Sequence, residues 1–312
     1  MEMLFSIGSV ERDTGLSKDT LRVWEKRYSF PQPIRDALGD RSYSIEQVEK
    51  LRLLKRLIDS GYRPSKIINL EVLELRALAE QAEKISTRPA HFEKKRDDLR
   101  IYLDACKEHR FDDLRRLLSR ELLRLGLYRF ISEVIAPLNT IIGTLWATGE
   151  IAVYEEHLYT ESAQVVIRNA ISAVSVLPEE GSVGPKILLT TFPYESHGLG
   201  LLMAEAIFAL EGAKCISLGT QTPIMDIARA AEKQDADIVA LSFSEAMNGN
   251  HVVEDLSELR SALPRSCEIW AGGSCSVIHR RPPDGIRVLG LEGIGIALAD
   301  WRQAQPQSQG RP

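Results

Sequence analysis

The chain has 312 residues, of which 44% are hydrophobic and 27% charged, so we expect a globular protein of two or three domains. It has neither a run of about 18 apolar residues nor a basic N-terminal stretch before an apolar core, which argues against a membrane span or secretion signal. The four cysteines form no Cys-x-x-Cys pair, which favours reduced thiols in the cytoplasm over a disulfide or zinc framework.

Charge is unevenly distributed along the chain. Residues 1–70 hold 13 Lys/Arg and 10 Asp/Glu, a net charge of +3, whereas the remainder holds 26 and 34, a net charge of −8. A mildly basic head on an acidic body permits contact with nucleic acid through the head alone. We use the name head for residues 1–75.

The first part of the head reads as two short helices. In SIGSVERDTGLSKDTLRVWEKRY, Gly15 ends the first helix, and the hydroxyl of Ser17 caps the second by accepting from a backbone N–H. Leu21 and Trp24 are spaced for the buried face of the second helix, which also carries several basic residues. By spacing alone, a helix-turn-helix and an ordinary amphipathic pair with solvated charges are equally good interpretations.

The second part of the head has the pattern of a wing followed by a helix. The stretch FPQPIRDALGDRSYS, residues 30–44, is rich in proline and glycine and predicts a loop or small hairpin. Ser44 and Gln47 predict a capping box at the start of the next helix, which Gly61 ends.

Together these motifs resemble the N-terminal domain of MerR-family transcription regulators, a winged helix-turn-helix, over nearly all of residues 4–70. The resemblance implies that the second helix enters the major groove of double-stranded DNA and that the wing (residues 30–44) contacts phosphates. Trp24 is expected in the core rather than on DNA. The implied DNA-contacting residues are Lys18, Thr20, Arg22, Lys26 and Arg27 in the helix and Arg35, Arg41 and Tyr43 in the wing.

The middle of the chain predicts a linker and a helical domain. Residues 76–97 are expected to form the linker, and residues 98–178 carry four amphipathic helices on short loops, which predicts a four-helix bundle. The third helix is expected to bend at Pro137, and the fourth to end before Pro178. No sustained heptad pattern follows residue 75, so assembly into oligomers must depend on other parts of the chain.

Strands and helices alternate in residues 184–304, which predicts a doubly wound parallel α/β domain with flavodoxin-like strand order. Residues 305–312 are expected to form a disordered tail. The expected strands are residues 186–192, 214–219, 237–243, 267–273 and 285–290. Ligands of such sheets bind at the carboxyl ends of the strands.

Polar and small residues follow those strand ends, so they are expected to meet at one edge of the sheet: His197, Ser242, Ser244, Gly272 and Gly273. Glycines there would admit something bulky close to the backbone. The sequence has no cluster of aspartates or cysteines to make a complete metal cage. One imidazole suits a corrinoid, whose ring supplies four nitrogens to its cobalt; the alternative is a loop histidine without a ligand.

The spacing closely resembles the cobalamin-binding domain of methionine synthase, mutases and related proteins. Residues Glu195 to Gly200 are followed by 41 residues, Ser242-Phe243-Ser244, 27 residues and Gly272-Gly273. The resemblance implies that His197 binds cobalt as the lower axial ligand and that Glu195, which replaces the family's aspartate, orients the imidazole. Ser244 also differs from the family's residue at its position, but less than Glu195 does. The nucleotide tail would lie beside Ser196, Gly198, Gly200, Ser242, Ser244, Gly272 and Gly273.

The order of the three domains resembles the CarH/LitR group of light-responsive repressors, whose bundles share a Trp, nine residues, Glu-His signature. Here the signature is Trp146, Glu156 and His157, which are otherwise typical of a core tryptophan and a surface Glu-His pair. The resemblance implies that these residues cover the upper face of adenosylcobalamin. Ala147 stands where some light-sensing members have a histidine that can bind cobalt.

The function implied is that of a non-enzymatic transcriptional regulator, a repressor, that acts as a homo-oligomer of two or four chains. Adenosylcobalamin would hold bundle and sheet in one arrangement, oligomers would bind operator DNA through several heads, and light would release them. Three alternatives stay open: a light-independent sensor of cobalamin or another tetrapyrrole, a corrinoid-carrying methyltransferase subunit, and a scaffold without cofactor.

Overall fold

The computed structural model describes residues 4–35, 39–59, 62–78, 99–174, 184–245, 247 and 249–304. The chain forms two compact units, Met1–Lys94 with Gly143–Ala152, and Lys95–Ile142 with Val153–Pro312. Most of the expected linker, Gly61, Pro178 and the expected tail lie outside the described residues. No helix in the described ranges is long and apolar enough to cross a membrane.

The head contains the predicted helix pair, α1 (Ile7–Thr14) and α2 (Lys18–Tyr28). Gly15 ends α1 in the left-handed region with φ of 70°, and the Ser17 hydroxyl accepts from the backbone N–H of Thr20 at 3.1 Å. Both predicted caps are therefore confirmed. Leu21 and Trp24 are buried in the head core, as predicted.

The wing forms a two-stranded hairpin of β2 (Ile34–Arg35) and β3 (Arg41–Ser44), and β1 (Leu4–Ser6) pairs with the other side of β3. Sequence reasoning missed β1 because three residues show no usable periodicity. Beyond the wing lie α3 (Ile45–Asp59), α4 (Pro64–Ile67) and helical residues 72–78.

Only half of the predicted capping box forms. The Ser44 hydroxyl accepts from the backbone N–H of Gln47 at 3.5 Å. The Gln47 side chain pairs instead with the backbone of Gln32, accepting from its N–H and donating to its carbonyl, each at 2.8 Å. It therefore joins α3 to the loop after α2, a non-local contact that the local motif does not reveal.

The bundle contains α7 (Arg100–Lys107), α8 (Phe111–Leu125) and α11 (Val153–Val174), together with a third helical run between α8 and α11. This run has three segments, α9 (Leu127–Arg129), a π-helical segment (Phe130–Ile135) and α10 (Ala136–Thr148). Pro137 follows the π-helical segment, whose wider turn suits a residue that lacks an N–H and crowds the preceding turn.

The sheet is fully parallel, and its order β5-β4-β6-β7-β8 confirms the flavodoxin-like prediction. Its strands are β4 (Lys186–Thr190), β5 (Lys214–Gly219), β6 (Ile238–Phe243), β7 (Glu268–Gly273) and β8 (Ile286–Val288).

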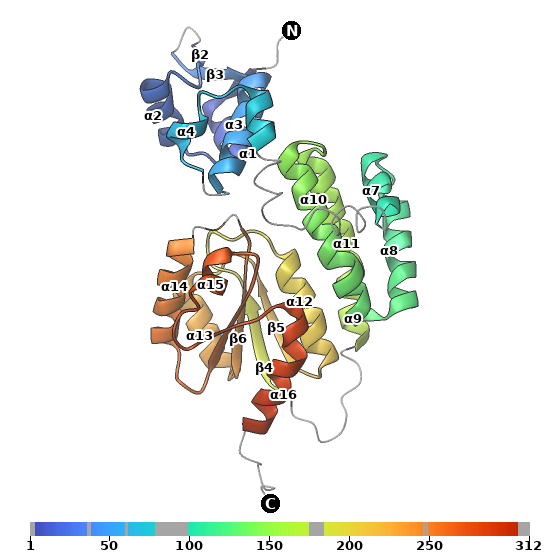
Figure 1. The fold of residues 1–312 in the computed structure, drawn as a ribbon. Helices are drawn as coiled ribbons and strands as arrows, with labels where there is room; N and C mark the ends of the chain where they lie inside the picture. The colour runs from blue at the N-terminus through green and yellow to red at the C-terminus, as the bar shows by residue number, and fades with distance from the viewer. Residues whose placement is uncertain are drawn as a thin grey trace, which may run out of the picture. The chain divides into compact units, whose positions relative to one another are not determined.

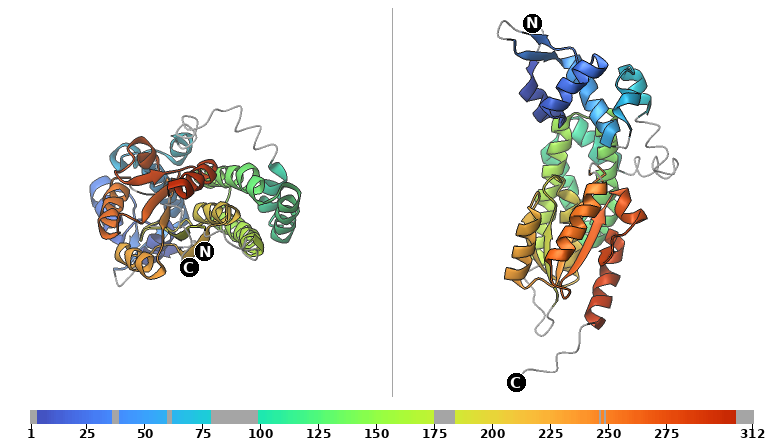
Figure 2. Two further views of the ribbon diagram at one scale, coloured as in Figure 1. Left: turned by 90° about the horizontal axis from the view of Figure 1, so that it is seen from below. Right: turned by 90° about the vertical axis from the view of Figure 1, so that its left-hand side faces the viewer.

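Helices cover both faces of the sheet, with α12 (Leu199–Leu210) and α16 (Ile294–Ala304) on one face and α13 (Ile224–Gln234), α14 (Gly249–Ala262) and the short α15 (Ser276–Arg280) on the other (Figures 1 and 2). The long bundle helix α11 packs along α12. The bundle therefore adjoins the helix that begins directly after His197.

The predicted serines and glycines lie within the last residues of their strands rather than beyond them, apart from Ser244, which follows β6. Ser242 pairs with Gly272, and Phe243 with Gly273. Gly273 has φ of 103°, and a Cβ there would lie 2.2 Å from the carbonyl oxygen of Phe243. Both the backbone angle and the close approach require glycine.

We predict that Gly273→Ala destabilises the chain through both effects, by about 3 kcal/mol, which lowers the thermal midpoint by about 6–12 °C. Gly212→Ala is the matched control, because Gly212 has φ of 76° but a Cβ there would meet no atom within 4 Å. Gly212→Ala should lower the free energy of unfolding by about 1 kcal/mol, from backbone strain alone. Calorimetry that gives the two variants equal midpoints would contradict the close-packing argument.

Candidate functional site

The candidate histidine lies in the loop between β4 and α12, which is closed by its own hydrogen bonds. The buried Thr191 hydroxyl donates to the carbonyl of Glu195 at 2.6 Å and accepts from the backbone N–H of Gln221 at 2.8 Å. The backbone N–H of Glu195 donates to the carbonyl of Phe192 at 3.0 Å. These bonds hold the Glu195 side chain in the interior, where it is 1% exposed.

The carboxylate of Glu195 joins two segments of the chain. Oε1 accepts from the backbone N–H of His197 at 2.9 Å and lies 2.7 Å from Nδ1 of its ring. Oε2 accepts from the backbone N–H of Ser244 at 2.7 Å, just after β6. Burial alone would raise the pKa of Glu195, but the hydrogen bonds from His197 and Ser244 outweigh it and leave the pKa below its ordinary value.

The imidazole of His197 is oriented through its Nδ1 nitrogen. Its side chain is 61% exposed, and Nδ1 faces Glu195 and lies 3.3 Å from the Ser244 hydroxyl. A carboxylate at Nδ1 favours the tautomer with the proton on Nδ1 and the lone pair on Nε2. Nε2 is therefore the nitrogen that suits a metal.

The side chains around His197 suit a metal that already carries most of its ligands. Among the described residues, no group of three or more His, Cys, Asp or Glu is arranged to hold a metal ion. The described residues at this edge thus offer an oriented imidazole rather than a cage, which fits the cobalt of a corrinoid.

The glycines at this edge lie close to other parts of the chain itself. A Cβ on Gly200 would lie 2.9 Å from the Ser242 hydroxyl oxygen, and one on Gly272 would lie 2.9 Å from the carbonyl oxygen of Leu289. Gly198 is similarly close to Thr220, at 3.1 Å from its Cγ2. These glycines therefore do not by themselves indicate a ligand, and the Glu195–His197 pair is the stronger signal.

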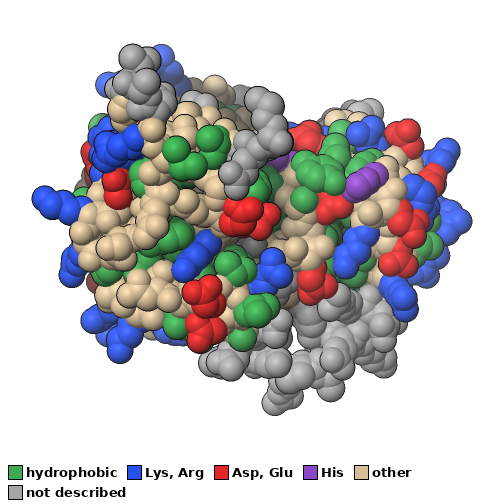
Figure 3. Space-filling view, turned by 90° about the horizontal axis from the view of Figure 1, so that it is seen from above, with side chains coloured by type: hydrophobic (Ala, Val, Ile, Leu, Met, Phe, Trp, Pro, Cys, Tyr) green, Lys and Arg blue, Asp and Glu red, His purple; other side chains and the backbone are tan. Residues whose placement is uncertain are grey.

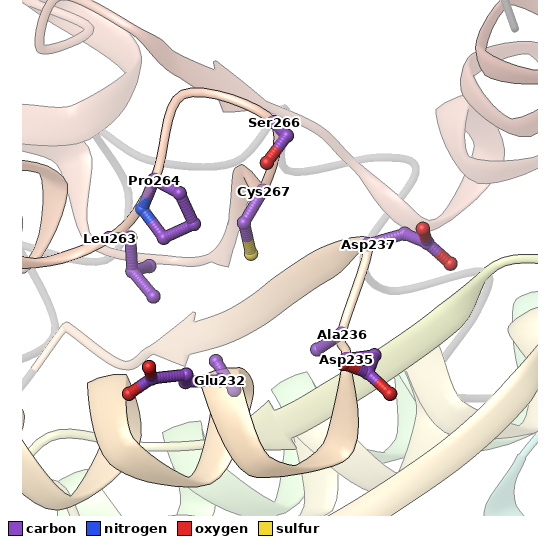
Figure 4. Close-up of a pocket in the computed structure, with 9 residues that line it drawn as sticks. Glu232, Asp235, Ala236, Asp237, Leu263, Pro264, Ser266 and Cys267 are labelled. Atoms are coloured by element: carbon purple, nitrogen blue, oxygen red, sulfur yellow. The ribbon is translucent and has the colours of Figure 1, made fainter.

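The pocket drawn in Figure 4 lies elsewhere on the sheet domain. It has a volume of about 320 Å³ and is lined by the end of α13, by Asp237 just before β6, and by Leu263, Pro264, Ser266 and Cys267 before β7. In a parallel sheet these segments meet at the amino ends of the strands, opposite to His197. The pocket is therefore separate from the candidate site.

The predicted bundle signature falls in α10 and α11. Trp146 is half-buried near the end of α10, in the first compact unit, whereas Glu156 and His157 lie in the first turns of α11, in the second. Glu156 accepts from the Thr160 hydroxyl at 2.8 Å, and His157 is 70% exposed.

A neighbouring contact, which sequence reasoning did not anticipate, fixes the start of α11. Nε2 of His109, in the loop between α7 and α8, lies 2.8 Å from Oε1 of Glu155 and 2.9 Å from the Tyr154 hydroxyl. Tyr154 and Glu155 directly precede the signature pair, but their partner is 45 and 46 residues away in sequence, so no local pattern indicates it.

In the head, the basic side chains of α2 lie at the surface. Lys18, Arg22, Lys26 and Arg27 are exposed, while the Thr20 hydroxyl pairs with that of Ser17 at 2.8 Å within the helix cap. In the space-filling view of Figure 3, lysine and arginine side chains stand among acidic and apolar ones. The exposed residues of α2 can therefore meet phosphates or bases, and Thr20 serves the helix cap.

Tyr43 is a correction to the predicted wing contacts. It is 0% exposed and belongs to the head core, and burial raises its pKa. Alternate residues of a strand share a face, so Tyr43 lies on the same face of β3 as Arg41, which turns toward Glu25 of α2. That face covers the core, and Tyr43 therefore packs there rather than against DNA.

Three family models match consecutive parts of this chain: MerR HTH family regulatory protein over residues 5–71, and two models of a B12 binding domain, over residues 99–170 and 185–282. The matches agree with the helix-turn-helix and the parallel sheet described above, and they give the chain a MerR-type helix-turn-helix domain followed by B12 binding domains.

Two relatives match along nearly the whole chain. The HTH-type transcriptional repressor CarH of Myxococcus xanthus is 29% identical over 94% of this chain and 96% of its own length. The repressor CarA of the same organism is 26% identical over 99% and 100%. The monomethylamine corrinoid protein of Methanosarcina barkeri shares the fold, with a TM-score of 0.51 and 16% identity over 67% of this chain and 99% of that one.

We predict that Glu195→Asp, which restores the family's residue, weakens this site. A side chain one methylene shorter cannot reach both His197 and the backbone N–H of Ser244, and losing a hydrogen bond to a charged group costs about 1.5–3 kcal/mol. The thermal midpoint of the chain without cofactor should fall by about 3–12 °C. Ser196→Ala, at the exposed neighbouring position, should leave it unchanged, and an aspartate variant as stable as the unaltered chain would contradict the prediction.

Proposed function

We propose that this protein is a DNA-binding repressor, not an enzyme, whose assembly and operator binding depend on adenosylcobalamin and are reversed by light. The observation that carries the proposal is the buried Glu195 carboxylate that holds His197 at the carboxyl edge of a sheet within a matched B12 binding domain. Both full-length relatives are named as repressors, which supports repression.

In this proposal His197 binds cobalt through Nε2, and Glu195 orients its ring. Adenosylcobalamin supplies a cobalt–carbon bond that light breaks. Trp146, Glu156 and His157 would contact the cofactor, and His109 holds Tyr154 and Glu155, which directly precede the last two. The residues assigned to the nucleotide tail are Ser196, Gly198, Gly200, Ser242, Ser244, Gly272 and Gly273.

The head performs DNA recognition in the same proposal. Lys18, Thr20, Arg22, Lys26 and Arg27 of α2 enter the major groove, and the wing arginines contact phosphates. The domain boundaries are 1–75 for the head, 98–178 for the bundle and 184–304 for the sheet domain. A homo-oligomer of two or four chains lets several heads bind one operator, so that tethering multiplies the affinity of each.

A light-independent cobalamin sensor is the second candidate, and one observation favours it. Ala147 directly follows Trp146, and an alanine offers no atom that can bind cobalt. Such a regulator would bind the cofactor through the same His197 and respond to its presence alone.

The full chain should retain adenosylcobalamin through gel filtration in darkness, with an absorption spectrum that changes in His197→Ala. His251→Ala removes another exposed histidine of the sheet domain and should leave the spectrum and retention unaltered. If the unaltered chain loses the cofactor on the column, cofactor binding is wrong.

The light response is tested on the same material. We expect green illumination to reduce the oligomer mass measured by light scattering and to weaken binding to a selected DNA duplex by at least about tenfold, because fewer tethered heads then share one operator. Equal mass and equal affinity in darkness and after illumination would contradict light control and favour the light-independent sensor.

A further inference from the structure

Both arginines of the wing hydrogen-bond to one carboxylate on α2. Arg35 on β2 donates a terminal nitrogen to Oε1 of Glu25 at 2.9 Å, and Arg41 on β3 donates Nε to Oε2 at 2.7 Å. Each oxygen of Glu25 thus holds one strand of the hairpin. The side chains of Glu25 and Arg41 are 23% exposed and that of Arg35 is 50% exposed, so the cluster lies at the boundary between core and solvent.

Glu25 stays ionised in this arrangement. The hydrogen bond from Arg41, supported by that from Arg35, lowers the pKa of Glu25 below its ordinary value. The three groups together carry one net positive charge, where two unpaired arginines would carry two. Glu25 therefore has two physical effects: it fixes the direction of the wing arginines relative to α2, and it reduces the attraction of the wing for phosphate in general.

We propose that Glu25 is a positioning residue for DNA recognition, which sets the wing arginines in register with the groove helix and so raises the preference of the head for its operator over other DNA. This inference rests on the proposed DNA-binding function and assigns Glu25 a role in its specificity. Phosphate contacts carry little sequence information themselves, but they fix the orientation in which the groove helix reads bases.

The same domain offers matched controls for the charge. Arg52 of α3 donates two hydrogen bonds to Asp13 of α1, at 2.9 and 2.8 Å, in a similar ion pair that does not involve the wing. Asp19 pairs with Arg22 at 2.9 Å on α2 itself. Asp13→Asn therefore breaks a comparable pair elsewhere in the head, and Asp19→Asn removes a negative charge from the groove helix without altering the wing.

The experiment measures binding of the full chain to two duplexes at several salt concentrations, with every variant in the same cofactor state. One duplex is selected from a random library by the unaltered chain, and the other is a shuffled sequence of equal length and composition. Glu25→Gln should weaken binding to the selected duplex about tenfold and strengthen binding to the shuffled one about two- to threefold. The salt slope for the shuffled duplex should steepen by about one unit.

Glu25→Asp separates the effect of side-chain length from the effect of the negative charge. It keeps the carboxylate but is too short to hold both arginines, so it should weaken binding to the selected duplex without strengthening binding to the shuffled one. Asp13→Asn should change both affinities less than about twofold. Asp19→Asn should strengthen both by similar factors, so that their ratio stays constant.

A purely structural ion pair would give a different result. The ratio of the affinities for the selected and the shuffled duplex is the deciding quantity. If Glu25→Gln changes this ratio no more than Asp13→Asn does, or if Glu25→Asp leaves it as in the unaltered chain, the positioning role is wrong. DNA binding itself would then still stand. If the unaltered chain selects no sequence at all, the proposed function fails and the inference with it. Thermal unfolding of each variant checks that the head is folded.

Discussion

The bond between the buried carboxylate of Glu195 and the imidazole of His197 is the contact on which the candidate site depends. It orients the imidazole through Nδ1. The Glu195 carboxylate is held in place because the Thr191 hydroxyl closes the loop and the backbone N–H of Ser244 donates to the second carboxylate oxygen. Three of the four polar groups involved come from the segment after β4 and one from the end of β6. Pairing of these two adjacent parallel strands is therefore a condition of the site.

Among the described residues, carboxylates that join separate segments lie near each of the proposed functional regions. Glu195 joins the β4 loop to β6, Glu155 joins the start of α11 to His109, and Glu25 joins α2 to both strands of the wing. A carboxylate suits this task because its two oxygens can each accept from a different segment. The bridges lie beside the residues that we assign to the lower ligand, the upper side of the cofactor and DNA. Each thus constrains the orientation of a functional side chain.

Sequence reasoning was most accurate where local chemistry decides the structure. The caps at Gly15 and Ser17, the strand positions and the strand order follow from turn residues, apolar runs and the rules of parallel sheets. It was wrong for Tyr43 and for half of the capping box, because Tyr43 and Gln47 find their partners across the head. The glycines at the sheet edge also proved to serve packing between segments that are distant in sequence.

The sequence alone therefore determined the classes of element, their order and the identity of the histidine at the end of the first sheet strand. Those features depend on interactions over a few residues and on topology, which residue spacing records directly. Only the tertiary structure decided that Glu195 reaches Ser244 as well as His197, and that one glutamate holds both wing arginines. Such contacts depend on distances between segments many residues apart, and these distances exist only once the core has brought the segments together.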